Sequence, residues 1–172
     1  MPVNMKNVIA DTFVSMAKQK PVDKITVKAL IEACGVSRQT FYYHFQDIME
    51  VIEWTLEQAT QEMLERSLKS QSAREALIVL IDTSKANSVF IRKLLDSQKR
   101  AQIEILFVQA ARSYCQRLLQ ERKEELPVND LETEAALDFL SFGITGILFK
   151  YCGQNSIDSS KLADQICRLF PV

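Results

Sequence analysis

Apolar residues recur at helical spacing along almost the whole chain. Met5, Ile9, Phe13 and Met16 fall on one side of a helix predicted over residues 3–18, which ends before Pro21. No segment alternates polar and apolar residues as a half-buried strand does. The pattern therefore predicts an all-α fold of about nine helices. The further helices are expected at 27–34, 38–43, 48–68, from 73, at 88–95, around 103–118, at 130–151 and at 158–170.

Capping residues mark where several of these helices begin. Thr26, Ser37 and Asp47 each precede an apolar stripe, and a hydroxyl or carboxylate there accepts the free backbone N–H groups of the first turn. Residues 72–75, Ser-Ala-Arg-Glu, form a capping box before the fifth helix. Gly35 stands where a tight turn with positive φ is needed. Toward the C-terminus the predicted boundaries are Pro127, Asn129, Asp130, Gly153, Asp158 and Pro171.

The first three helices, with the glycine turn between the second and the third, have the order of a helix-turn-helix. Phe41 and Phe45 are spaced to face inward from the third helix. Such a helix enters a major groove with polar groups outward and its apolar face anchored. We therefore predict a DNA-binding domain over residues 1–47 and a helical domain over 48–172. The residues left on the outer side are Arg38, Gln39, Thr40, Tyr42, Tyr43 and His44.

Composition and charge are compatible with this interpretation. The chain is 47% hydrophobic and 25% charged, and only four glycines and four prolines interrupt it. Its formal net charge is −1, but residues 1–47 hold six Lys or Arg against four Asp or Glu, whereas the rest holds 15 against 18. A mildly positive N-terminal segment followed by an acidic remainder is typical of a protein that binds nucleic-acid phosphates through one domain.

Other classes of protein are disfavoured. Cys34, Cys115, Cys152 and Cys167 form no CxxC pair and the chain has one histidine, so we expect neither a metal site nor a cofactor. A helical carboxylate enzyme needs a Glu-x-x-His pair, which is absent, so we do not expect an enzyme. Residues 135–149 are apolar but too short to span a membrane. Without a signal-peptide pattern, a cytoplasmic protein is expected.

At this point the sequence resembles the tetracycline-repressor (TetR) family of bacterial regulators. The resemblance lies in Ile25-Thr26-Val27, in Cys34-Gly35-Val36-Ser37 and above all in residues 40–45, Thr-Phe-Tyr-Tyr-His-Phe. It is weaker over residues 142–148 and 162–170. Residues 38–42 with Phe45-Gln46 also resemble the subgroup that contains activators of dihydroxyacetone kinase genes.

The resemblance implies a role for each outward-facing residue of the predicted helix-turn-helix. Thr26 and Ser37 would cap their helices and contact phosphate. Arginine pairs with guanine and glutamine with adenine in the major groove. The residues implied to reach base edges are Lys28, Arg38, Gln39 and Thr40, and those implied to hold the backbone or pack on a thymine methyl are Tyr42, Tyr43 and His44.

One position departs from the family pattern. TetR proteins usually carry a lysine at the start of the fourth helix, where it grips a phosphate, and this chain has Ile48 there. That contact is therefore missing or is made by a backbone N–H.

Residues 135–149 are apolar on all sides, so this helix should be buried against more than one neighbour. We expect one side to pack on its own domain and the other on a second copy, with a single larger core in a monomer as the alternative. The resemblance implies a four-helix bundle in a homodimer. The expected interface residues are Phe142, Gly143, Gly146, Ile147, Leu162, Ile166 and Leu169.

Relatives of this type bind a small molecule in the body, and a protein co-regulator is a further option. Aromatic residues at helical spacing are candidates for a pocket, although such stripes are also ordinary core. Asp138, Ser141 and Thr145 lie on one side of the eighth helix, where solvent exposure is the simplest explanation and a polar pocket wall the alternative. The candidate effector residues are Phe90, Phe107, Tyr114, Asp138, Phe139, Ser141 and Thr145, with Tyr151 as a further aromatic.

The prediction is thus a transcription regulator that binds double-stranded DNA as a homodimer. A helical protein-interaction module that does not bind DNA is the alternative that the sequence leaves open.

Overall fold

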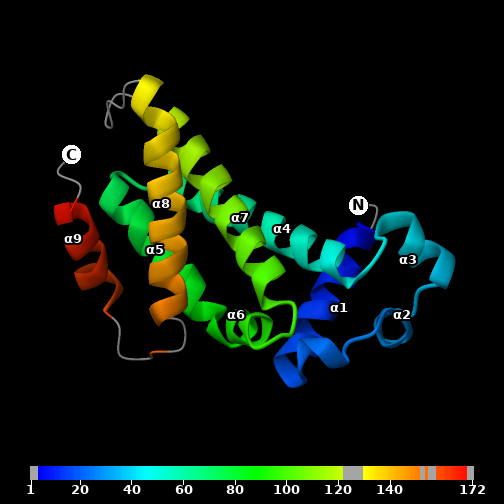
Figure 1. Ribbon diagram of the computed structural model, residues 1–172. Helices are drawn as coiled ribbons and strands as arrows, with labels where there is room; N and C mark the ends of the chain where they lie inside the picture. Colours follow the sequence, from blue (N-terminus) through cyan, green and yellow to red (C-terminus); the bar gives the residue numbers. More distant parts are fainter. Residues whose placement is uncertain (1–3, 122–129, 152–153, 155–157, 170–172) are drawn as a thin grey trace. The chain divides into compact units, whose positions relative to one another are not determined.

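The computed structural model describes residues 4–121, 130–151, 154 and 158–169. Within these ranges the chain forms nine α-helices, one short 3-10 helix and no strand (Figure 1). The predicted all-α class is confirmed. The expected boundary residues Pro127, Asn129, Gly153 and Pro171 lie outside the described residues, as does Phe170, the expected last residue of the ninth helix.

The chain divides into two compact units. The first comprises residues 1–58 and 89–106, and the second comprises residues 59–88 and 107–172. The helices are α1 (Met5–Gln19), η1 (Val22–Lys24), α2 (Val27–Cys34), α3 (Arg38–His44), α4 (Ile48–Leu68), α5 (Ala73–Ala86), α6 (Ser88–Leu95), α7 (Arg100–Glu121), α8 (Asp130–Tyr151) and α9 (Ser159–Leu169).

The core of the first unit is built around α1. Ile9 and Phe13 are buried as the apolar stripe predicts, whereas Met5 and Met16 lie half-buried at its edges. Phe13 packs edge to face on Phe90 of α6, with ring centroids 6.1 Å apart. Apolar burial of this kind is the main source of stability for such a small unit.

A second link joins residues 89–106 to the same unit. The Asp23 carboxylate accepts hydrogen bonds from the Ser97 hydroxyl (2.7 Å) and from the Gln98 amide (3.1 Å). The helix-turn-helix segment is therefore completed by residues far along the chain, which the sequence pattern does not indicate.

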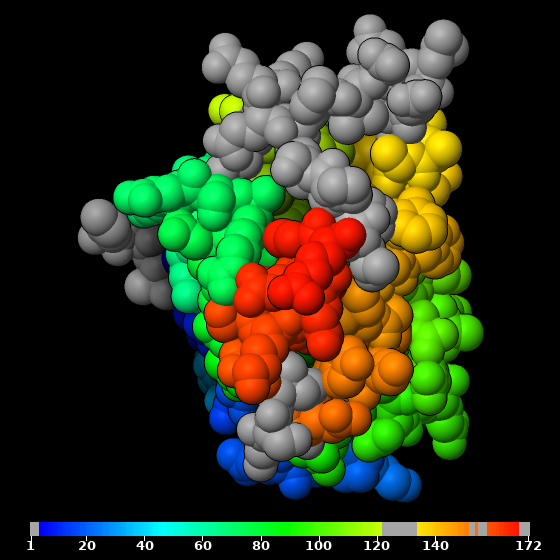
Figure 2. Space-filling model, turned by 90° about the vertical axis from the view of Figure 1, so that its left-hand side faces the viewer, coloured from blue at the N-terminus to red at the C-terminus, as the bar shows by residue number. Residues whose placement is uncertain are grey.

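In the second unit the C-terminal part of α4 and helices α5, α7, α8 and α9 surround one apolar core, and α9 packs on α5 (Figure 2). Arg74 of α5 fixes α9, because its guanidinium donates to Asp164 (2.5 Å) and to Ser160 (2.6 Å). The hydrogen bond from Arg74 holds the pKa of the Asp164 carboxyl below its ordinary value. The buried residues of this core are Leu64, Leu80, Ile81, Tyr114, Cys115, Leu137, Leu162 and Ala163.

Polar contacts also fix α7 inside this unit. The Tyr114 hydroxyl donates to the buried Ser67 hydroxyl at 2.9 Å. On the surface the Arg112 guanidinium bridges the carboxylates of Glu134 and Asp138, which are one turn apart on α8. These contacts set which side of α8 faces α7.

Helix α8 packs Leu137 and Ile144 against the core, but two hydroxyls are buried on it and two phenylalanines are exposed. Phe139 and Phe142 are each 64% exposed, while Ser141 and Thr145 are buried. The expected solvent exposure of the polar positions is therefore correct for Asp138 and wrong for Ser141 and Thr145. The Ser141 hydroxyl compensates for its burial by donating to the Asp138 carbonyl at 3.0 Å. The Thr145 hydroxyl is buried without a hydrogen-bond partner among the described residues.

This unpaired hydroxyl gives a test of the packing. Thr145→Val should raise the free energy of unfolding by about 1 kcal/mol, because valine keeps a similar shape and removes a buried polar group that lacks a partner. Urea denaturation followed by circular dichroism measures the change.

Thr83→Val is the matched control in the same unit. The Thr83 hydroxyl donates to the Val79 carbonyl (2.7 Å) and accepts from Arg66 (3.2 Å), so this variant should not gain stability. A Thr145→Val protein that is less stable than the wild type would contradict the assignment of an unpaired hydroxyl.

Candidate nucleic-acid interface

The local sequence determines how α2 leads into α3. The Thr26 hydroxyl accepts the Ala29 amide at 3.1 Å and so caps α2. Gly35 ends α2 with φ of +66°, in the left-handed region that favours glycine. The Ser37 hydroxyl then accepts the Thr40 amide at 2.9 Å and caps α3. Both caps and the glycine turn are as predicted from the sequence.

Two phenylalanines anchor α3 from inside. Phe41 is fully buried and Phe45 is 3% exposed, and their ring centroids lie 6.1 Å apart. Both point inward as their spacing predicts. The opposite side of α3 is therefore held outward by the burial of these rings.

The outer side of α3 exposes most of the predicted reading residues. Arg38, Gln39, Tyr42 and Tyr43 are exposed, and of the two tyrosines Tyr43 is the more exposed, at 84% against 47%. The Arg38 guanidinium carbon lies 5.5 Å from the centre of the Tyr42 ring, which orients this cation at the start of the helix.

The remaining predicted residues are more constrained. Thr40 is half-buried, and its hydroxyl shares a 2.8 Å hydrogen bond with the Ser37 hydroxyl. His44 is half-buried, and its ring packs edge to face on Tyr43. Lys28 lies 4.0 Å from Glu32, but both side chains are exposed, and a surface pair of this kind exchanges readily for a phosphate contact.

The first turn of α4, which begins at Ile48, carries acidic caps. Ile48 is half-buried. The Asp47 carboxylate accepts the amides of Met49 (2.7 Å) and Glu50 (3.1 Å), and the Glu50 carboxylate accepts the amide of Gln46 (2.6 Å). These amides already have acceptors, which disfavours a backbone contact to phosphate at this turn.

The residues predicted for an effector pocket are dispersed. Phe90 lies in the core of the first unit, whereas the others belong to the second unit. Asp138 and Phe139 are exposed, and Phe107 packs edge to face on Phe149 with ring centroids 5.1 Å apart. The inner side of the second unit contains Tyr114, Ser141 and Thr145.

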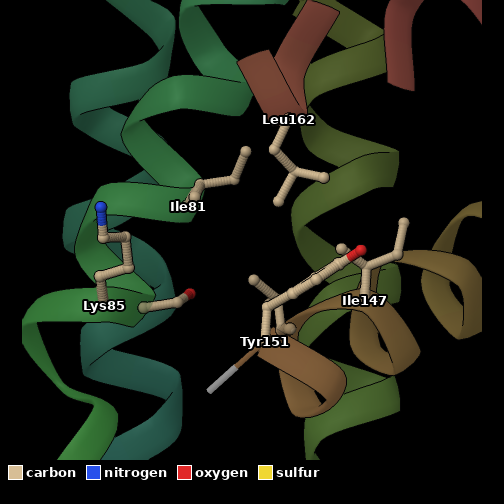
Figure 3. A pocket seen from close by; sticks show the side chains of 7 residues that line it. Ile81, Lys85, Ile147, Tyr151 and Leu162 are labelled. Atoms are coloured by element: carbon tan, nitrogen blue, oxygen red, sulfur yellow. The ribbon is translucent and has the colours of Figure 1, made fainter. Parts of the chain in front are cut away.

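A pocket in the second unit lies between α5, α8 and α9 (Figure 3). Its walls are mostly apolar, and the Lys85 ammonium stands at one side, 3.4 Å from the Ser159 hydroxyl. Only Tyr151 among the aromatic candidates lines it. Lys85 and Ile81, one turn apart on α5, were missed because helical spacing does not tell which partner a side chain meets. The lining residues are Ile81, Ser84, Lys85, Ile147, Leu148, Tyr151 and Leu162.

The residues predicted for a dimer interface lie on two different sides. Phe142, Gly143 and Gly146 are exposed on the outer side of α8. By contrast, Ile147, Leu162 and Ile166 pack against the core of their own chain. The side chain of Leu169 lies outside the described residues. An all-apolar helix gives no sequence signal for its orientation, so the two groups could not be told apart.

The described cysteines are free thiols. Burial raises the pKa of the Cys115 thiol to about 12, so it stays protonated. Cys34 and Cys167 are half-buried free thiols, and Cys152 lies outside the described residues. In the described part of the chain no His, Cys, Asp and Glu side chains gather into a group that could hold a metal ion. No described helix has the length and apolar character needed to cross a membrane.

Comparison with known families agrees with a helix-turn-helix formed by α2 and α3. Residues 9–53 match the family described as bacterial regulatory proteins, tetR family. Residues 71–171 match a TetR-type transcriptional regulator C-terminal region. The chain belongs to the TetR family. It is therefore a DNA-binding transcription regulator and, since this family is not enzymatic, not an enzyme, as the sequence predicts.

The TetR family includes relatives of the expected subgroup. The HTH-type dhaKLM operon transcriptional activator DhaS of Lactococcus lactis is 23% identical over 129 residues, which cover 74% of this chain and 68% of the relative. The subgroup resemblance is thus confirmed.

Solved structures share the TetR fold. The dihydroxyacetone kinase operon activator DhaS has a TM-score of 0.71 at 20% identity and covers 96% of this chain and 93% of its own. Lin0861 from Listeria innocua has a TM-score of 0.74 at 17% identity, and the alignment covers 98% of this chain and 94% of Lin0861. At these identities the likeness shows the fold alone.

Inner and outer residues of α3 should respond differently to substitution. Gln39→Ala and Tyr43→Ala should each weaken DNA binding by about 1–3 kcal/mol without changing the melting temperature, because both side chains are exposed. Phe41→Ala should instead lower the free energy of unfolding by about 3–5 kcal/mol. Anisotropy titration of labelled DNA and thermal melting separate the two effects. Equal folding defects in all three variants would contradict the assignment of inside and outside.

Proposed function

We propose that this TetR-family chain binds a palindromic operator as a homodimer, and that a small-molecule effector or a protein co-regulator controls the binding. In this proposal residues 1–47 are the DNA-binding domain, residues 48–172 are the domain for dimerisation and effector binding, and the protein acts in the cytoplasm. The observation that carries the proposal is a capped helix α3 that buries Phe41 and exposes Arg38, Gln39 and Tyr43.

The position of each exposed residue on α3 supports a division of roles. Arg38 and Gln39 are in the first turn, the part of a recognition helix that reaches base edges. Arg38 would pair with guanine and Gln39 with adenine. Tyr43, near the end of the helix, has the exposure needed for the sugar-phosphate backbone or a thymine methyl.

Residues outside the exposed side of α3 would mainly hold phosphate. The Thr26 hydroxyl accepts an amide within its own helix, and its hydrogen remains able to donate to a phosphate oxygen. The Ser37 hydroxyl accepts the Thr40 amide and also shares a hydrogen bond with the Thr40 hydroxyl, so it can donate to phosphate when Thr40 is the donor of that bond. Lys28, on the first turn of α2, adds a positive charge.

The outer side of α8 supports the homodimer. Phe139 and Phe142 are large apolar side chains that remain 64% exposed, and such a patch marks an interaction surface. A Cβ added at Gly143 or Gly146, on the same side, would meet nothing within 4 Å. A two-fold axis near the middle of α8 would bring the phenylalanines of one copy over the glycines of the other.

This arrangement predicts the response of the assembly to charge. Phe142→Glu and Gly146→Glu should each convert a dimer of about twice the 19.6 kDa chain mass to monomers, because a carboxylate would be buried at the contact. Analytical ultracentrifugation at micromolar concentration measures the mass. Gln116→Glu, at an exposed position of α7, is the control and should remain dimeric. A monomeric wild-type protein would overturn the proposal of a dimer.

Two features of the second unit favour control by an effector. The first is the pocket between α5, α8 and α9, whose walls are mostly apolar; its free volume of about 20 Å³ holds only a water-sized molecule, so the helices would have to move apart for an apolar effector to enter (Figure 3). In addition, the Thr145 hydroxyl is buried without a partner among the described residues, and a bound molecule that reached it would supply one.

DNA binding by the wild-type protein is tested with the DNA that flanks its own gene. In mobility-shift titrations this DNA should be bound more tightly than random DNA of the same length, and the affinity should fall as salt rises, because phosphate contacts release counterions. A folded, helical protein that shifts neither DNA would instead support a helical protein-interaction module.

A further inference from the structure

Residues 45–50, which lead from the end of α3 into the first turn of α4, contain no lysine or arginine. Ile48 stands there, and the carboxylates of Asp47 and Glu50 occupy amides of the turn. Two negative charges at this point repel a phosphate and offset the favourable end of the α4 dipole. A phosphate next to this turn therefore requires a positive charge from another element.

Lys6, in the first turn of α1, lies at this turn in space. Its Nζ is 5.4 Å from the ring centre of Phe45, the residue that ends α3, and 4.3 Å from the ring centre of Trp54 on α4. The beginning of α1 accordingly lies beside the first turns of α4 (Figure 1). Within the residues that the structure describes, Lys6 forms no ion pair with a carboxylate.

The two aromatic rings hold the ammonium without cancelling its charge. A cation over a ring face is attracted by the ring quadrupole, so its position is restricted while its full charge remains. An ammonium has three N–H donors and serves phosphate as a point charge. Lys6 is half-buried, so part of its side chain remains accessible while its ammonium lies against the two rings.

We propose that Lys6 supplies the phosphate contact at the α3–α4 turn that Ile48 cannot make. The inference rests on the DNA binding proposed above and adds to it a residue outside the helix-turn-helix motif. Since a phosphate contact carries no base information, Lys6 contributes to specific and random DNA equally.

The test is the salt dependence of binding to random-sequence DNA. Lys6→Gln should reduce the slope of log K against log salt by about 1.8 per dimer, at ~0.9 per phosphate neutralised. Lys6→Arg should keep the slope. Lys18→Gln, an exposed position in the last turn of the same helix, is the matched control and should also leave it unchanged.

A double variant separates a phosphate contact from a merely structural role. In Lys6→Gln with Ile48→Lys the charge returns to the turn from α4, so the lost slope should be recovered although the contact with the rings is absent. Trp54 is the only tryptophan of the chain, so its fluorescence and the melting curve report whether each variant keeps the packing around it.

Three results would overturn the proposal. A Lys6→Gln protein with the wild-type slope shows that Lys6 does not reach phosphate, and a lower melting temperature with an unchanged slope shows that Lys6 only positions α1. An equal loss of slope in Lys18→Gln shows a general effect of charge. If the wild-type protein binds no DNA, the proposed function itself is refuted, and the role of Lys6 with it.

Discussion

A helix of seven residues is too short to be stable on its own in water, so α3 depends on what holds it. Phe41 and Phe45 fix its inner side by burial, and the Ser37 hydroxyl fixes its first turn. This anchoring determines the direction of every other side chain on the helix. Arg38, Gln39 and Tyr43 can meet a groove as a rigid set only because the two phenylalanines are locked in the core.

The core that holds α3 is itself assembled from distant parts of the chain. Phe90 packs on Phe13, and the Asp23 carboxylate binds Ser97 and Gln98. A substitution in residues 89–106 would therefore alter the packing around the helix-turn-helix although the helix-turn-helix sequence is unchanged. This gives substitutions in α6 a route to affect DNA binding through packing.

In the second unit, α8 combines buried hydroxyls with exposed phenylalanines. The exposure of Phe139 and Phe142 is unfavourable for an isolated subunit, and a second copy that covers them would remove this cost. On the inner side one of the two buried hydroxyls lacks a hydrogen bond. The Ser141 hydroxyl donates to a carbonyl of its own helix, whereas the Thr145 hydroxyl has no partner among the described residues. In the proposed homodimer, the rotation of α8 would thus set both the packing of its inner side and the assembly through its outer side.

The sequence alone determined the helices and which residues of α3 are buried and which are exposed. Thr26, Gly35, Ser37 and Asp47 act through atoms a few residues away, and the spacing of Phe41 and Phe45 decides inside and outside within one helix. Because these interactions involve residues only a few positions apart, the local sequence contains all the partners, and the structure agrees with the prediction.

Only the tertiary structure decided the rest. The rotation of α8, the position of Lys85 in a pocket and the placement of Lys6 over Phe45 and Trp54 depend on contacts between residues far apart in the chain. The physical reason is that hydrophobic burial is non-directional: an apolar pattern tells that a side chain is covered but not by which partner.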